Sequence, residues 1–146
     1  MNEWTPPVLT DEQRAHLTAW CEDLESDKYV QTVARLRSNS PNGADYSYCC
    51  LGVACNTFKK LTGKGTWGID GIFTATAFSG SATSLPSFVA EWLLGGCGGS
   101  LLVYYKGKTE DVIKLNDCNK LTFKEIAHCV RETYGLPRAA GENKEV

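Results

Sequence analysis

The chain has 146 residues, of which 42% are hydrophobic and 22% are charged, so its composition is that of a globular protein rather than a disordered one. At this length a single domain is expected, and folding buries about two thirds of the surface of the unfolded chain. Fifteen Lys and Arg residues stand against 17 Asp and Glu residues, which gives a formal net charge of −2. A protein that coats nucleic acid through phosphate contacts carries a basic excess, so nucleic acid is not an expected partner.

The N-terminal stretch MNEWTPPVLTDEQR lacks the basic and apolar regions of a secretory signal, and no apolar run is long enough to cross a bilayer. We therefore expect a protein of the cytoplasm that makes no membrane contact. In that reducing compartment the seven cysteines are expected to be free thiols. Cys21, Cys55 and Cys129 lie close to apolar helical stripes, where they would act as small buried hydrophobes.

The first expected element is a helix that begins after Thr10. Thr10 and Gln13 form a capping-box pattern, in which each side chain accepts a hydrogen bond from a backbone N–H group of the other residue. Apolar residues then recur at the spacing of one helical face, at Leu17, Trp20, Cys21 and Leu24.

The segment 28–38 is less regular. Tyr29, Val33 and Leu36 would share one face of a helix, and a loop rich in Ser, Asn, Pro and Gly follows over residues 38–45. The segment is therefore interpreted as a short helix before a loop.

A second clear helix is expected from residue 50 to Gly63, which is placed to end it in the left-handed conformation. Its apolar face consists of Leu51, Ala54, Cys55, Phe58 and Leu61. Gly52 lies inside this helix at a cost of about 1 kcal/mol relative to Ala. A residue without a side chain there predicts the close approach of another backbone or of a ligand.

Short strands and a short helix are expected next. A strand over 66–69 and another over 72–78 would form a hairpin around the turn Asp70-Gly71. A helix from Pro86 to Leu94 would turn its apolar side chains inward, namely Phe88, Val89 and Trp92. The GGCGG run then acts as a flexible joint, and a further strand over 101–105 turns at Gly107.

The last expected element is a helix that begins after Thr122. Thr122 and Glu125 form a second capping box, and Gly135 with Pro137 ends the helix. The elements together predict a single α+β domain over residues 1–137, with helices packed around a small, mainly antiparallel sheet. The charged residues 138–146 are expected to be a disordered tail.

Glycines 63, 65 and 68 match the pattern G-x-G-x-x-G, but the order of the elements argues against a dinucleotide site. That fingerprint needs a strand before it and a helix after it, because the pyrophosphate lies at the N-terminus of the helix. Here a helix precedes the glycines and a strand follows them, so the pattern is set aside.

The cysteines leave two alternatives to buried thiols. Cys49, Cys50 and Cys55 could begin a zinc site that Cys97, Cys118 or a histidine completes, but no C-x-x-C pair is present. Cys50 could instead be a nucleophile activated by a distant histidine. Buried thiols are the favoured interpretation, so no metal, no cofactor and no catalytic residue is assigned.

Polar and aromatic side chains provide the candidates for ligand binding. Asn116 and Asp117 are expected in a polar turn before the last helix, where they would either bond nearby backbone groups or hold the hydroxyl groups of a ligand. Among the four Trp and six Tyr residues, those expected in loops could stack on a flat ligand, namely Tyr46, Tyr48 and Trp67.

Three motifs in combination resemble a family of small phage and prophage proteins. They are YCCLGVAC at residues 48–55, LPSFVAEWLLG at residues 85–95 and LNDCNKLTFKEIA at residues 115–127. The family pattern is an arginine-bearing LRS segment followed by CCLGV-C, LP…WLG and LND…F-EIA, and the likeness covers residues 28–134. The resemblance implies a viral accessory protein that acts in the cytoplasm of a bacterial host.

Small phage accessory proteins often disarm host defence, and one route is to bind a nucleotide-derived immune signal without cleaving it. We therefore expect an anti-defence protein that sequesters a small nucleotide-like ligand. The other candidate partners are further copies of the same chain, in a homo-oligomer, and a host protein. The expected ligand-binding residues are Arg35 and Arg37 for phosphate, Tyr48 and Trp67 for stacking, Asn116 and Asp117 for sugar hydroxyls, and Cys50 at the start of the second helix.

Two alternatives belong to other classes of function. The first is an inhibitor that docks on a host or phage enzyme, for which a large exposed apolar patch would be the sign. The second is a small enzyme that uses Cys50 or an acid–base pair built on Asp117. Because no catalytic motif is present in the sequence, a binding protein is favoured over an enzyme.

Overall fold

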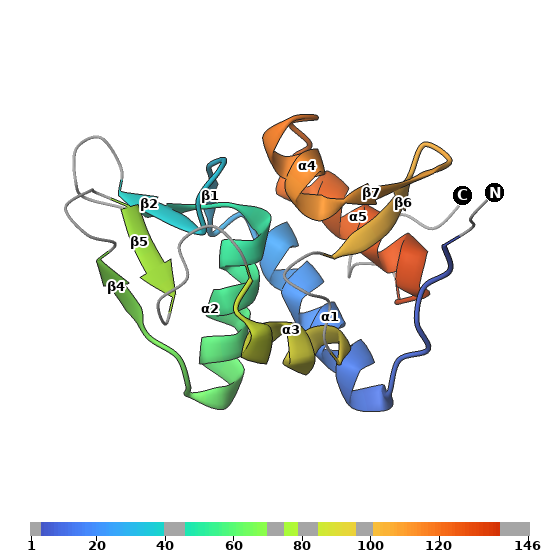
Figure 1. The fold of residues 1–146 in the computed structure, drawn as a ribbon, viewed down its shortest axis with the longest axis horizontal. Coiled ribbons are helices and arrows are strands. Elements are labelled where there is room, and N and C mark those ends of the chain that lie inside the picture. The colour runs from blue at the N-terminus through green and yellow to red at the C-terminus, as the bar shows by residue number, and fades with distance from the viewer. Residues whose placement is uncertain (1–3, 40–45, 70–74, 79–84, 96–100, 138–146) are drawn as a thin grey trace.

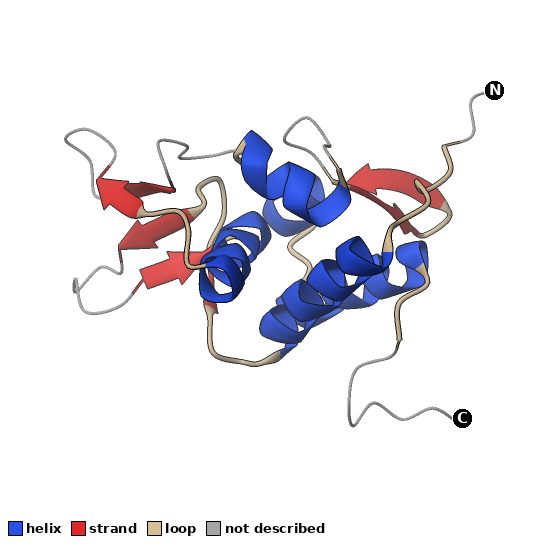
Figure 2. Cartoon of the chain, turned by 90° about the horizontal axis from the view of Figure 1, so that it is seen from below, coloured by secondary structure: helices blue, strands red, loops and turns tan. Residues whose placement is uncertain are grey.

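Helices form the centre of the molecule, and two separate β-sheets lie at its two ends (Figures 1 and 2). The computed structural model describes residues 4–39, 46–69, 75–78, 85–95 and 101–137. This arrangement confirms the expected α+β class. No helix of these ranges is both long and apolar enough to pass through a lipid bilayer.

Helices α1 (Asp11–Glu25) and α5 (Phe123–Tyr134) pack against each other, and both begin as the sequence predicts. Each has a complete capping box, formed by Thr10 with Gln13 and by Thr122 with Glu125. The predicted face of α1 is buried, and α5 ends at Gly135 in the left-handed conformation.

Helix α2 (Cys50–Thr62) lies at the centre of the fold, and Gly63 ends it with a φ of 72°. Four of the five predicted apolar positions are buried, but Leu61 is 53% exposed. Ten residues after Leu51 the helix has turned Leu61 about 80° away from it, which places Leu61 at the margin of the buried face.

A β-carbon added to Gly52 would lie 1.8 Å from the carbonyl oxygen of Leu36. The predicted close approach is therefore that of another backbone, and it brings the segment before β2 onto the first turn of α2.

The larger sheet has the strand order β1-β3-β2-β5-β4. Its strands are β1 (Val30–Gln31), β2 (Arg37–Asn39), β3 (Tyr46–Tyr48), β4 (Trp67–Ile69) and β5 (Ala75–Phe78). All pairs are antiparallel except β1 with β3, and the predicted hairpin appears as the pair β4–β5. The turn Asp70-Gly71 lies outside the described residues, as do the loop 40–45, residues 96–100 with Cys97, and the tail 138–146.

The helix expected in segment 28–38 is wrong, because this segment forms β1 and β2 joined by a bend. The β-branched residues Val30, Thr32 and Val33 favour extended backbone, and the N–H of Thr32 donates to the carbonyl of Tyr48 at 2.7 Å. Ala34 has a φ of 70°, which no helix accommodates.

Helix α3 (Ser87–Leu94) begins after Pro86, as predicted, but its inward face differs from the prediction. Val89 is buried, whereas Trp92 is half-buried and Phe88 lies on the exposed side. Ala90 and Leu93 complete the buried face instead.

The smaller sheet is a hairpin of β6 (Leu102–Tyr105) and β7 (Lys108–Asp111). Helix α4 (Val112–Asp117) follows it directly, and the Asp111 carboxylate accepts a hydrogen bond from the N–H of Ile113 at 2.8 Å. Asn116 and Asp117 were expected in a turn, but they are the last two residues of this short helix.

Candidate functional site

Arg37 on β2, the middle strand of the larger sheet, lies against two aromatic rings. Its guanidinium carbon is 3.7 Å from the centre of the Tyr46 ring and 4.5 Å from that of the Trp67 ring. Tyr48 and Tyr29 continue the row, with ring centres 5.9 Å apart from Trp67 to Tyr48 and 5.2 Å apart from Tyr48 to Tyr29. These five residues are called the Arg37 cluster below.

The strand register explains how the Arg37 cluster forms. Arg37 and Tyr48 are direct cross-strand partners on β2 and β3, so their side chains lie on one face of the sheet. Trp67 comes from β4, and its indole N–H donates to the Asn56 side chain of α2 at 2.8 Å. The cluster is therefore held between the sheet and the central helix.

The Arg37 cluster is continuous with the core on one side and open to solvent on the other. The Trp67 ring lies 4.9 Å from that of Phe78, which is fully buried, while Tyr46 remains 45% exposed. Partial burial raises the pKa of Tyr29, and the nearby Asp23 carboxylate raises it further. The cluster thus combines flat rings, a fixed cation and partial exclusion of water.

Asn116 lies at the centre of a second, buried group. Its side-chain oxygen accepts from the amide of Gln31 at 2.8 Å and from the backbone N–H of Cys50 at 3.2 Å. Its side-chain nitrogen donates to the carbonyl of Thr32 and to the carboxylate of Asp117, each at 2.8 Å. All four hydrogen-bonding positions of the amide are occupied and the residue is 1% exposed. The expectation that Asn116 holds ligand hydroxyls is therefore wrong.

Asn116 instead supplies the cap that α2 lacks. Cys49 stands at the N-cap position of α2 and makes no side-chain cap, so the first N–H of the helix takes its acceptor from α4. Two of the three motifs noted in the sequence meet at this hydrogen bond between Cys50 and Asn116.

Cys50 is fully buried, and its thiol donates to the carbonyl of Val112 across 3.6 Å. Burial raises the pKa of this thiol well above its ordinary value, so it stays protonated at neutral pH. Arg35 lies half-buried in the bend before β2 and has an interaction partner of its own.

The seven predicted ligand-binding residues therefore separate into groups. Arg37, Tyr48 and Trp67 come together in the half-buried Arg37 cluster, and Cys50, Asn116 and Asp117 belong to the group centred on the buried Asn116. Gln31 joins the groups, because it pairs with Tyr48 in the sheet and bonds to Asn116. Arg35 belongs to neither group.

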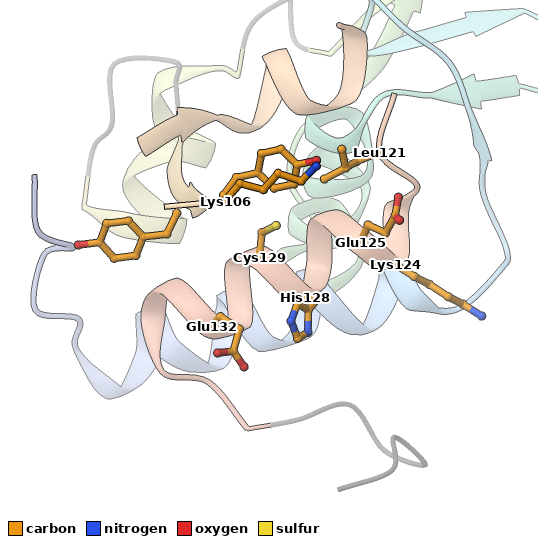
Figure 3. Close-up of a pocket in the computed structure, with 9 residues that line it drawn as sticks. Lys106, Leu121, Lys124, Glu125, His128, Cys129 and Glu132 are labelled. Atoms are coloured by element: carbon orange, nitrogen blue, oxygen red, sulfur yellow. The ribbon is translucent and has the colours of Figure 1, made fainter. Parts of the chain in front are cut away.

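Sequence reasoning missed a groove of about 630 Å³ between the β6–β7 hairpin and α5 (Figure 3). It is lined by Tyr104, Tyr105, Lys106, Leu121, Lys124, Glu125, His128, Cys129 and Glu132. A signal for it was present in the run Tyr104-Tyr105-Lys106 before Gly107, but its other wall comes from a helix far along the chain.

Within the described ranges, no three His, Cys, Asp or Glu side chains are grouped so that they could hold a metal ion. The cysteines of these ranges are free thiols, and Cys118 is the exposed one among them.

Residues 13–134 match the family described as a domain of unknown function, DUF8296, and the chain therefore belongs to that family. No curated protein and no solved structure matches the chain.

Proposed function

We propose that this member of the DUF8296 family is a non-catalytic binding protein that sequesters a small nucleotide-derived signalling molecule at the Arg37 cluster. In this proposal it serves a phage as an anti-defence protein in the cytoplasm of the bacterial host. The observation that carries the proposal is the position of the Arg37 guanidinium over the rings of Tyr46 and Trp67.

Contact with two aromatic rings restricts the orientation of the Arg37 guanidinium. The Arg37 guanidinium lies over both rings, and its N–H groups form a planar fork. A planar fork of this kind matches two oxygens of a phosphate group. Because the two rings already order the long side chain, phosphate binding loses less conformational entropy than it would at an unrestrained arginine.

The neighbouring rings support recognition of a base. A base that stacks on an aromatic side chain gains about 1–3 kcal/mol. Tyr46 is the most exposed ring of the cluster, and Trp67 and Tyr48 lie half-buried beside it. A phosphate at Arg37 would place the rest of a nucleotide within reach of these rings. Sugar hydroxyls are assigned to no residue, since Asn116 is fully bonded inside the protein.

The state of the predicted catalytic candidates favours binding over catalysis. The Cys50 thiol is buried and its pKa is raised well above the ordinary value, so it offers almost no thiolate nucleophile at neutral pH. The Asp117 carboxylate accepts a hydrogen bond from Asn116. Neither residue reaches the Arg37 cluster directly.

Exposed apolar side chains favour a second candidate function, the inhibition of a host or phage enzyme by docking. Val30 on β1 is 63% exposed, and Val33 after it is also exposed. Both lie at the end of the sheet beyond β3, where β1 has no further partner strand among the described residues. A protein partner would cover this edge and leave Arg37 free of any nucleotide.

The test is native mass spectrometry of the protein purified gently from cells that express a panel of signalling-nucleotide synthases. We expect the wild-type protein to retain an adduct of nucleotide mass. The variants Arg37→Gln and Arg37→Lys should both lose it, because lysine keeps the charge but lacks the planar fork. Lys108→Gln, on the distant hairpin, is the matched control and should retain the adduct. Wild-type protein at its unliganded mass in every strain of the panel would reject sequestration of those signals.

A further inference from the structure

The groove between the β6–β7 hairpin and α5 lies at the other end of the molecule from the Arg37 cluster (Figure 1). Its volume of about 630 Å³ is in the range of small-molecule sites, roughly 300–1,000 Å³. Nothing in the proposed function uses this space.

The floor of the groove is apolar. Leu121 and Cys129 are both almost fully buried, and Tyr105 on β6 covers them from the opposite wall. The side chains of Lys106, Leu121 and Cys129 point into the same space (Figure 3). Burial and the Glu125 carboxylate raise the pKa of the Cys129 thiol, which therefore contributes a neutral surface.

Lys106 is held over this floor by the turn of the hairpin. Lys106 and Gly107 have φ values of 52° and 79°, as in a type I′ turn, and the left-handed backbone costs a non-glycine residue about 1–2 kcal/mol. The Lys106 ammonium lies 5.3 Å from the centre of the Tyr105 ring. In the part of the chain that the structure describes, no carboxylate is within 4 Å of this ammonium.

The other charged side chains that line the groove are a lysine that already forms an ion pair and two carboxylates. Lys124 pairs with Asp27 at 3.3 Å, and Glu125 accepts the N–H of Thr122 in the capping box. Glu132 adds a second carboxylate to the lining. A polyphosphate would be repelled by these carboxylates, whereas a single negative charge at Lys106 would be compensated.

We propose that this groove binds a small amphipathic monoanion, with its apolar body on Tyr105, Leu121 and Cys129 and its carboxylate at Lys106. The site is independent of the Arg37 cluster and takes a different class of ligand, a monocarboxylate with a hydrocarbon body in place of a nucleotide.

The test compares octanoate with its neutral analogue 1-octanol by titration of the ¹⁵N-labelled protein, followed by NMR. Octanoate should shift the amide signals of Tyr105, Lys106 and Cys129. It should also bind about fivefold more tightly than octanol, which is the difference in affinity that one exposed ion pair provides. Lys106→Gln should remove this preference and leave octanol binding unchanged. The matched control Lys108→Gln, on the same hairpin, should keep the preference.

Equal affinities for octanoate and octanol in the wild-type protein would overturn the proposal, as would shifts that map outside the groove. Cys129→Phe provides a second test by filling the floor, and it should abolish binding of both ligands while the amide spectrum stays that of a folded protein. Lys106→Gln should also retain any nucleotide adduct at wild-type level, so that failure of this site and failure of the Arg37 site are separate results.

Discussion

One buried amide, that of Asn116, ties together segments that lie far apart in the sequence. It joins Gln31 and Thr32, around the end of β1, to Cys50 at the start of α2. A buried polar group that is fully bonded fixes one geometry, because any slippage leaves donors and acceptors unpaired. Asn116 therefore sets how β1 and α4 meet the central helix.

Replacing Asn116 with Ala is expected to lower the free energy of unfolding by about 2–4 kcal/mol. The change removes four hydrogen bonds and leaves the N–H of Cys50 and the carbonyl of Thr32 without these partners inside the protein. Urea denaturation followed by circular dichroism measures the effect. Asn119→Ala is the control, since Asn119 is exposed and should change stability by less than about 0.5 kcal/mol. Equal stabilities of the two variants would refute a structural role for Asn116.

At the scale of single residues, the sequence predicts chemical type better than burial. Arg37, Tyr48 and Trp67 were predicted to act together because a cation and rings near loops suit a flat anion, and the structure brings the three side chains together. Asn116 was misassigned because asparagine is mostly exposed and common in turns, and because three of its four partners lie 66 to 85 positions away. Nothing local in the sequence distinguishes a buried amide from a turn residue.

At the scale of elements, local signals predict the four longer helices, α1, α2, α3 and α5, but they miss the short helix α4 and fail where strand pairing is distant. The capping boxes of α1 and α5 and the apolar face of α2 are each complete within a few residues. Segment 28–38 offers only three apolar positions at helical spacing, and its extended form depends on pairing with β3, beyond the loop that follows. Long-range pairing decided the structure there.

The contact between α2 and the segment before β2 gives a prediction at this scale. Gly52→Ala would gain about 1 kcal/mol of helix propensity, but its β-carbon would lie 1.8 Å from the backbone oxygen of Leu36. Because backbone on both sides must move, we expect a net loss of about 2 kcal/mol or more in the free energy of unfolding. The exposed α2 variant Lys59→Gln serves as a reference that should change little. If urea denaturation found Gly52→Ala as stable as the wild-type protein, the two segments could not be packed backbone to backbone.

At the scale of the whole molecule, the helices separate the Arg37 cluster from the groove, one at each sheet (Figure 1). The sequence analysis predicted a single sheet because the strands expected over 66–69, 72–78 and 101–105 were all assigned to it, whereas the structure has two sheets. The strand order β1-β3-β2-β5-β4 depends on crossovers that no local pattern encodes. The groove was missed for the same reason, since its walls meet only after α5 packs beside the hairpin.

The buried thiols make the stability of the whole fold sensitive to alkaline pH. Burial raises the pKa of Cys21 to about 12 and that of Cys49 to about 11, from an ordinary value of 9.0. Below pH 9 each thiol is protonated in both the folded and the unfolded chain, so its full contribution to stability is present. Above that pH the unfolded chain releases the proton and the folded chain keeps it, so the free energy of unfolding falls.

The fall should be about 1.4 kcal/mol per pH unit for each such thiol, and urea denaturation between about pH 8 and about pH 11 measures it. Cys21→Ala should reduce the pH dependence of the free energy of unfolding by the contribution of one thiol, about 1.4 kcal/mol per pH unit, whatever its effect on stability at neutral pH. Cys118→Ala should leave the slope unchanged, because Cys118 is exposed. A wild-type slope that Cys21→Ala does not alter would mean that Cys21 meets solvent in the folded protein, contrary to its position between α1 and α5, where its thiol faces the carbonyl of Ala127.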